Sequence, residues 1–108
     1  VHPKSMGLAK TYYVKGKLAQ LAFDSGDPKY MDLYPDMLME AYNNFEKAIQ
    51  LDPNLKNTII RDNAYALLGN SFLNDAINKF NEQDFKGAMK SFERNVMISA
   101  NEMYVGVV

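Results

Sequence analysis

The feature that most constrains this chain is a helical pattern that occurs twice. Ala41, Phe45 and Ala48 stand four and three residues apart, so they share one face of a helix. Pro53 ends that helix, because proline cannot continue it. The first two residues of the pattern return forty-seven positions later as Ala88 and Phe92. An internal repeat predicts related helical units that bury their apolar faces against neighbouring elements.

Apolar spacing along the chain predicts four helices and no strand. They cover about residues 8–23, 36–51, 58–82 and 85–99, and residues 101–108 begin a further helix. Asp84 is expected to cap the fourth helix. We therefore predict a single all-α domain of two antiparallel hairpins, with repeat unit 1 at about 8–53 and repeat unit 2 at about 58–100. The long connection at 24–35 is either a packed insertion or a contact surface.

Most apolar residues on these helices are expected to face inward. In the first two helices the predicted inward set is Leu8, Tyr12, Leu18, Ala19, Leu21, Ala22, Phe23, Met37, Leu38, Ala41, Phe45, Ala48 and Ile49. In the last two it is Ile59, Ile60, Tyr65, Leu68, Phe72, Ala76, Ile77, Phe80, Phe85, Ala88, Met89, Phe92, Val96 and Met97. Asn44 is predicted to face outward. The glycines Gly16 and Gly69 are expected where two helices cross closely.

The repeat resembles the tetratricopeptide (TPR) family, whose units read W-x2-L-G-x2-Y, then A-x3-F, then P over two antiparallel helices. The first half appears as Tyr65-x2-Leu68-Gly69-x2-Phe72 and, less completely, as Tyr12-x2-Lys15-Gly16-x2-Ala19. The resemblance implies stacked hairpins of an α-solenoid, here with lengthened hairpins. The residues that would carry the structural motif are Tyr12, Gly16, Ala41, Phe45, Ala48, Pro53, Tyr65, Leu68, Gly69, Phe72, Ala88 and Phe92.

In that family the first helix of each pair lines a concave groove that binds peptides. The resemblance implies groove positions at Lys10, Tyr13, Lys17, Gln20, Leu21, Asn63, Ala66, Asn70, Leu73 and Asn74. Asparagine amides can pair with a peptide backbone, and lysine ammonium groups can meet a carboxylate. Chaperone-binding members clamp a carboxylate with a Lys and an Asn one helical turn apart. Here the Asn-type positions hold Asn70 and Lys17, and the Lys-type positions hold Ala66 and Tyr13, so the clamp is incomplete. Solvated polar faces are the alternative interpretation.

Residue types that support catalysis are scarce in this sequence. His2 is the only histidine and there is no cysteine, so a histidine triad or a thiolate nucleophile cannot be assembled. Neither a GxGxxG nor a GxxxxGK[ST] phosphate loop occurs. The acidic turn from Asp24 to Asp27 lacks the ligand order of a calcium loop, and capping explains its carboxylates. We therefore expect no enzyme activity, no metal and no cofactor.

The charge balance bears on the class of partner. Lys and Arg number 12 and Asp and Glu number 13, so the formal charge of −1 favours neither nucleic acid nor an anionic membrane surface. No apolar run approaches the roughly eighteen residues of a membrane span. A content of 47% hydrophobic and 23% charged residues is typical of a folded domain and indicates no particular compartment.

Neither end of the chain has the polar capping helix that terminal repeats usually carry. Val1-His2-Pro3 resembles the exit of a preceding helix, and residues 103–108 are mostly apolar. We expect an excerpt of a longer array, whose last segment covers the outer face of Phe85 to Val96 or pairs with a second molecule. Besides a peptide-binding scaffold, two functions stay open. One is a structural segment that stacks on neighbouring repeats or self-associates, and the other is a regulatory module of a larger protein.

Overall fold

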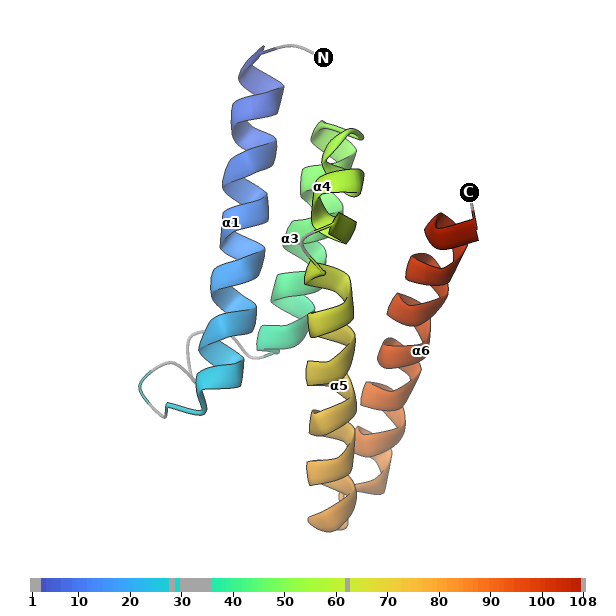
Figure 1. Ribbon diagram of the computed structural model, residues 1–108. Helices are drawn as coiled ribbons and strands as arrows, with labels where there is room; N and C mark the ends of the chain where they lie inside the picture. Colours follow the sequence, from blue (N-terminus) through green and yellow to red (C-terminus); the bar gives the residue numbers. More distant parts are fainter. Residues whose placement is uncertain (1–2, 28, 30–35, 62, 108) are drawn as a thin grey trace. The chain divides into compact units, whose positions relative to one another are not determined.

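The computed structural model describes residues 3–27, 29, 36–61 and 63–107 of the 108-residue chain. These residues form α-helices and no strand, which confirms the prediction of an all-α chain. The helices are α1 (Pro3–Ser25), α3 (Met37–Leu51), α4 (Leu55–Arg61), α5 (Ala64–Asn81) and α6 (Phe85–Val107) (Figure 1). His2 and most of the connection predicted as an insertion, residues 28 and 30–35, lie outside the described residues.

The chain divides into two compact units, Val1–Asp62 and Asn63–Val108. In the first unit α1 and α3 pack as an antiparallel pair, and α4 follows α3 through a short turn (Figure 1). That turn is closed by Leu55, whose N–H donates to the Asp52 carbonyl at 3.0 Å. In the second unit α5 and α6 form an antiparallel hairpin. The first unit thus contains α1, α3 and α4, and the second contains α5 and α6.

Helices α1 and α3 approach each other closely at Gly16, which is buried. A Cβ atom at this position would lie 2.6 Å from two carbons of the Phe45 ring and 3.0 Å from the carbonyl oxygen of Ala41. Phe45 and Ala41 are fully buried, and the Tyr13 ring is tilted against Phe45 with centroids 5.8 Å apart. The predicted close crossing is therefore confirmed at Gly16, where only glycine leaves room for the aromatic ring.

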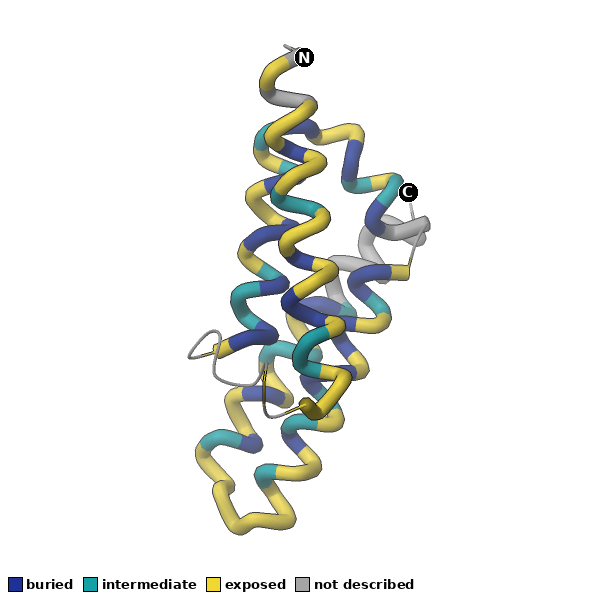
Figure 2. The backbone as a smooth tube through the Cα atoms, turned by 90° about the vertical axis from the view of Figure 1, so that its left-hand side faces the viewer, coloured by how far each residue is buried: buried dark blue, intermediate teal, exposed yellow. Residues whose placement is uncertain are grey.

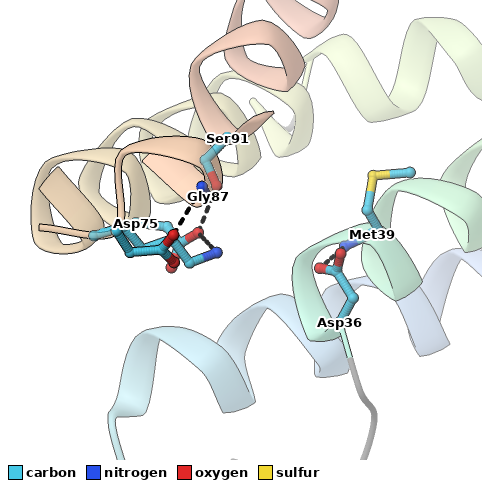
Figure 3. A network of polar contacts seen from close by, with 7 residues as sticks. Asp36, Met39, Asp75, Gly87 and Ser91 are labelled. Carbon is cyan, nitrogen blue, oxygen red and sulfur yellow. Dashed lines mark hydrogen bonds and ion pairs between the residues drawn. The ribbon is translucent and has the colours of Figure 1, made fainter. Parts of the chain in front are cut away.

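Polar side chains join α5 to α6. The Ser91 hydroxyl, which is 1% exposed, donates to Asp75 Oδ2 at 2.6 Å (Figure 3), and Lys79 Nζ lies 2.8 Å from the same oxygen. Asn95 Nδ2 donates to the carbonyl oxygen of Gly69 at 2.8 Å. Buried polar groups stabilise a fold only when they are paired, and both of these contacts are paired across the hairpin. They fix which residues of α6 face α5.

Carboxylates cap two of the helices. Asp36 Oδ1 accepts a hydrogen bond from the Met39 N–H at 3.3 Å at the start of α3 (Figure 3). Asp84 Oδ1 accepts one from the Gly87 N–H at 3.0 Å at the start of α6, which confirms the predicted cap. Both bonds satisfy amides that have no partner within the first turn of the helix.

The prediction of one continuous helix over residues 58–82 is wrong. The structure has α4 ending at Arg61 and α5 starting at Ala64, and Asn63 between them adopts a left-handed backbone with φ of 59°. Asparagine adopts this conformation more readily than most residues other than glycine. Apolar residues continue at helical spacing on both sides of Asn63, so the periodicity of the sequence does not predict the break between α4 and α5.

The predicted ends of the first and last helices are also corrected. α1 begins at Pro3 rather than near residue 8, and the missing N–H of proline costs nothing at the first position of a helix. The helix expected to end near Ser99, with a new one after it, is a single helix that continues to Val107. Ala100, unlike Pro53, favours helix continuation. Residues 101–107 therefore extend α6 and do not fold back over its own earlier turns.

The predicted core is confirmed in its central part and wrong at its margins. Buried as expected are Ala19, Met37, Leu38, Ala41, Phe45, Ala48, Ile59, Tyr65, Leu68, Phe72, Ala76 and Ala88. Predicted as inward but exposed are Leu8, Leu18, Leu21, Ile77, Phe80, Phe85, Met89, Phe92, Val96 and Met97. Asn44, predicted as outward, is buried, and its amide donates to the Glu40 carbonyl at 2.7 Å. Figure 2 shows buried and exposed residues alternating along each helix. A helix packed mainly on one partner buries only part of a wide apolar face.

Candidate functional site

The first predicted binding face lies on α1. Lys10, Tyr13 and Lys17 are three and four residues apart and therefore share one side of the helix. Both lysines are exposed, and Lys17 Nζ lies 5.4 Å from the centre of the Tyr13 ring, within cation–π range. Tyr13 in turn contacts the buried Phe45 ring. The buried Phe45 ring thus holds the Tyr13 ring in place, and the Lys17 ammonium group lies beside the Tyr13 ring.

Two other residues predicted for this face offer different surfaces. Gln20 is only 5% exposed, so its side chain contributes little to the surface of α1. Leu21 is 62% exposed and, with Leu18, forms an apolar strip near the end of the helix. The α1 face is therefore basic and aromatic at its centre, and it is formed by Lys10, Tyr13 and Lys17.

The second predicted face lies on α5. Asn70 and Asn74, one helical turn apart, are exposed, while Ala66 and Leu73 are partly buried beside them. Among the described residues neither of the two Asn side chains has a hydrogen-bond partner. Asn63, which precedes α5, is also exposed, and its side chain makes no capping hydrogen bond. This face presents amides that are accessible to an external ligand.

The two faces can form different polar contacts. Each Asn amide offers two donors and one acceptor oxygen, which matches the alternating groups of an extended peptide backbone. Each Lys ammonium group offers three donors and a positive charge that suits a carboxylate. Single exposed contacts of this kind contribute only about 0–1 kcal/mol. Specific binding would therefore need several of them together.

A third surface, an apolar groove in the second unit, was not predicted from the sequence. It has a volume of about 540 Å³, and Ile77, Phe80, Phe85, Met89 and Phe92 line it over the buried Ala76 and Ala88. The rings of Phe80 and Phe85 meet edge to face with centroids 5.4 Å apart, beside the largely exposed turn between α5 and α6 (Figure 2). The groove residues of α6 follow the apolar spacing of a helix, and this spacing alone predicts that they are buried.

Further comparisons add no assignment to these surfaces. In the described part of the chain, no group of three or more His, Cys, Asp or Glu residues is placed to hold a metal ion. None of the described helices is long and apolar enough to cross a membrane. The chain matches no protein-family model, and no characterised protein or solved structure matches it significantly.

Proposed function

We propose that this chain is a non-catalytic, TPR-like helical module that binds an extended peptide or protein segment. In each unit the candidate binding face is the exposed side of the first helix, α1 in the first unit and α5 in the second. The observation that carries the proposal is the pair of amides on Asn70 and Asn74, which are exposed one turn apart and have no hydrogen-bond partner among the described residues. Amides that stabilise no part of the fold are available for a ligand.

The packing of the motif residues supports the family resemblance. Gly16 of the first half-motif contacts Phe45 of the second half-motif across the α1–α3 crossing. Tyr65, Leu68 and Phe72 of the next first-helix motif are all buried. Phe92 departs from this pattern because it is 48% exposed. In the proposal, each antiparallel pair is a TPR-like unit, and its first helix carries the binding face.

Each unit offers one type of contact to a peptide. The Asn70 and Asn74 amides pair with its backbone, which gives affinity with little dependence on sequence. Lys10 and Lys17 meet acidic side chains or a terminal carboxylate, which selects acidic peptides. The contact of Lys17 with Tyr13 restrains the ammonium group before binding and lowers the entropy that binding must remove.

A library of short synthetic peptides with free carboxyl termini tests the proposal by fluorescence polarisation. For the peptides that bind, Lys17→Ala combined with Asn70→Ala is expected to weaken affinity about tenfold, or about 1.4 kcal/mol. The matched control is Asn43→Ala combined with Lys47→Ala, two exposed residues of the same types on α3. Both double variants should keep the melting temperature, because all four side chains are exposed.

The proposal is overturned if the two double variants bind equally well. It is also overturned if the library contains no ligand for the wild-type chain. Loss of stability in the Lys17 and Asn70 variant alone would assign these residues a structural role.

A further inference from the structure

Helix α6 carries two parallel rows of residues with spacings of three and four. One row, Ala88, Ser91, Asn95 and Ile98, faces α5 through the buried contacts described above. The other row, which we call the open seam, is Phe85, Met89, Phe92 and Val96. Its four side chains are between 48% and 64% exposed. Alternating spacings of three and four are typical of helices that pack side by side, and a helix with two such rows suits a position between two neighbours.

We propose that two copies of the chain associate through the open seams of their α6 helices. The two α6 helices lie antiparallel, and the two α5–α6 hairpins together form a four-helix bundle. The interface has two-fold symmetry, so the same residues contribute from both copies. Ile77 and Phe80 of α5, which are 47% and 61% exposed and border the same groove, extend the contact.

The apolar area supplies most of the contact that such a dimer needs. The open seam with Ile77 and Phe80 comprises six large apolar side chains, three of them phenylalanines. Aromatic side chains bury about 150–250 Å² each when fully covered, so this half-exposed set offers on the order of 600 Å². A standard stable interface buries about 800 Å² per partner. The flanking residues of both hairpins would supply the remainder.

Charges beside the open seam favour a second copy in antiparallel orientation. Lys86 and Glu93 each follow a seam residue by one position, so they lie on the same flank, and both are exposed. If Met89 packs against Phe92 of the other copy, Lys86 lies about 3 Å along the axis from Glu93 of that copy. The two-fold axis then gives two pairs of opposite charge. In a parallel pair the flanks with Lys86 and Glu93 would lie on opposite sides of the contact, so these charges would form no pairs across it.

Sedimentation equilibrium over a concentration series tests the dimer with the chain as it stands. We expect a monomer–dimer equilibrium for the wild type. Met89→Glu should raise the dissociation constant about a hundredfold, because two carboxylates would then be buried in an apolar contact. Leu18→Glu is the matched control: Leu18 is 60% exposed on α1, and its replacement should leave the dissociation constant unchanged.

The charge pairs are tested by reversal. Lys86→Glu should raise the dissociation constant about fivefold to thirtyfold, because it converts two attractive pairs into two repulsive ones. Adding Glu93→Lys gives pairs of opposite charge again, with the signs of positions 86 and 93 exchanged, and should restore dimerisation. Circular dichroism should show unchanged helix content in every variant, since all the replaced side chains are exposed.

Three outcomes would overturn the proposal. The first is a wild-type chain that stays monomeric at sub-millimolar concentration. A monomer whose groove binds a synthetic amphipathic helix counts as this outcome, because the groove would then fit a different partner. The second is a dimer that persists in Met89→Glu. The third is a double charge reversal that fails to restore what Lys86→Glu removes, which would exclude the antiparallel register.

Discussion

The contact between Gly16 and Phe45 predicts that Gly16→Ala destabilises the chain, although alanine is the better helix former. The added Cβ would lie 2.6 Å from two ring carbons of Phe45 and 3.0 Å from the Ala41 carbonyl oxygen. Phe45 is fully buried and contacts Tyr13, so its ring cannot turn aside without opening the α1–α3 crossing.

The magnitude follows from two opposing effects. Helix propensity favours Ala over Gly by about 1 kcal/mol in a helix interior. Forcing an extra methyl group into a packed core costs about 1–3 kcal/mol. Because both the ring and a backbone oxygen obstruct the methyl group, we expect overpacking to dominate, with a net loss of about 1 kcal/mol in the free energy of unfolding.

Two other glycines provide controls within the same chain. A Cβ at Gly7, also in α1, would meet nothing within 4 Å, so Gly7→Ala should stabilise the chain by about 0.5–1 kcal/mol. At Gly69 the nearest atoms would be 3.7 Å away, an ordinary contact, so Gly69→Ala should not destabilise. Gly16→Ala and Gly7→Ala should therefore differ by about 2 kcal/mol, with opposite signs.

Urea unfolding followed by far-ultraviolet circular dichroism measures these differences. In a Phe45→Leu background, Gly16→Ala should cost much less, because the smaller side chain leaves room for the methyl group; the double-mutant cycle isolates this coupling. If Gly16→Ala stabilises the chain as much as Gly7→Ala, the argument is refuted and the crossing is not closely packed.

The same measurement tests two predictions in the second unit. Ser91→Ala should lower the free energy of unfolding by about 1–2 kcal/mol, because it removes a buried hydrogen bond to Asp75, whereas Ser25→Ala at an exposed position should cost less than about 0.5 kcal/mol. Asp84→Ala should cost about 1 kcal/mol by removing the cap of α6, and Asp84→Asn should cost little because its side-chain oxygen still accepts the Gly87 N–H.

The central core was predictable because its residues follow the helical period closely. Ala41, Phe45 and Ala48 stand on one side of α3, and all three are fully buried. The close crossing at Gly16 was also predictable, since glycine inside a helix has a cost that close packing can offset. These predictions rest on local spacing alone, which is the information that a sequence carries most directly.

The orientation of α6 could not be predicted from local spacing. Its apolar row of Phe85, Met89 and Phe92 is exposed, while the row with Ser91 and Asn95 faces α5. Polar residues can occupy a buried row when their partners lie on the other helix, and Asp75 and the Gly69 carbonyl oxygen provide these partners. A hydrophobicity pattern does not contain such pairings, so it favours the wrong side of the helix.

The break at Asn63 was missed for a different reason. A single left-handed residue interrupts the helix without changing the apolar spacing on either side. For the candidate site, the sequence predicted exposed residues correctly at Lys10, Lys17, Asn70 and Asn74, because charged and amide side chains are rarely buried without a partner. The low exposure of Gln20 shows the limit of that rule.

The two proposed interactions use different side chains, and this separation makes a joint prediction. Peptide binding is assigned to polar residues of α1 and α5, and dimerisation to the apolar seam of α6. Met89→Glu should therefore raise the dimer dissociation constant about a hundredfold and leave the affinity of each chain for a library peptide within about twofold, since Met89 is 64% exposed on α6 and is not among the residues assigned to peptide binding. Lys17→Ala with Asn70→Ala should weaken peptide binding and leave the dimer dissociation constant unchanged.

The two assays can be combined by measuring peptide binding to both variants at concentrations below and above the dimer dissociation constant. If Met89→Glu also removes peptide binding at every concentration, the two surfaces act as one site and their assignment to separate functions fails.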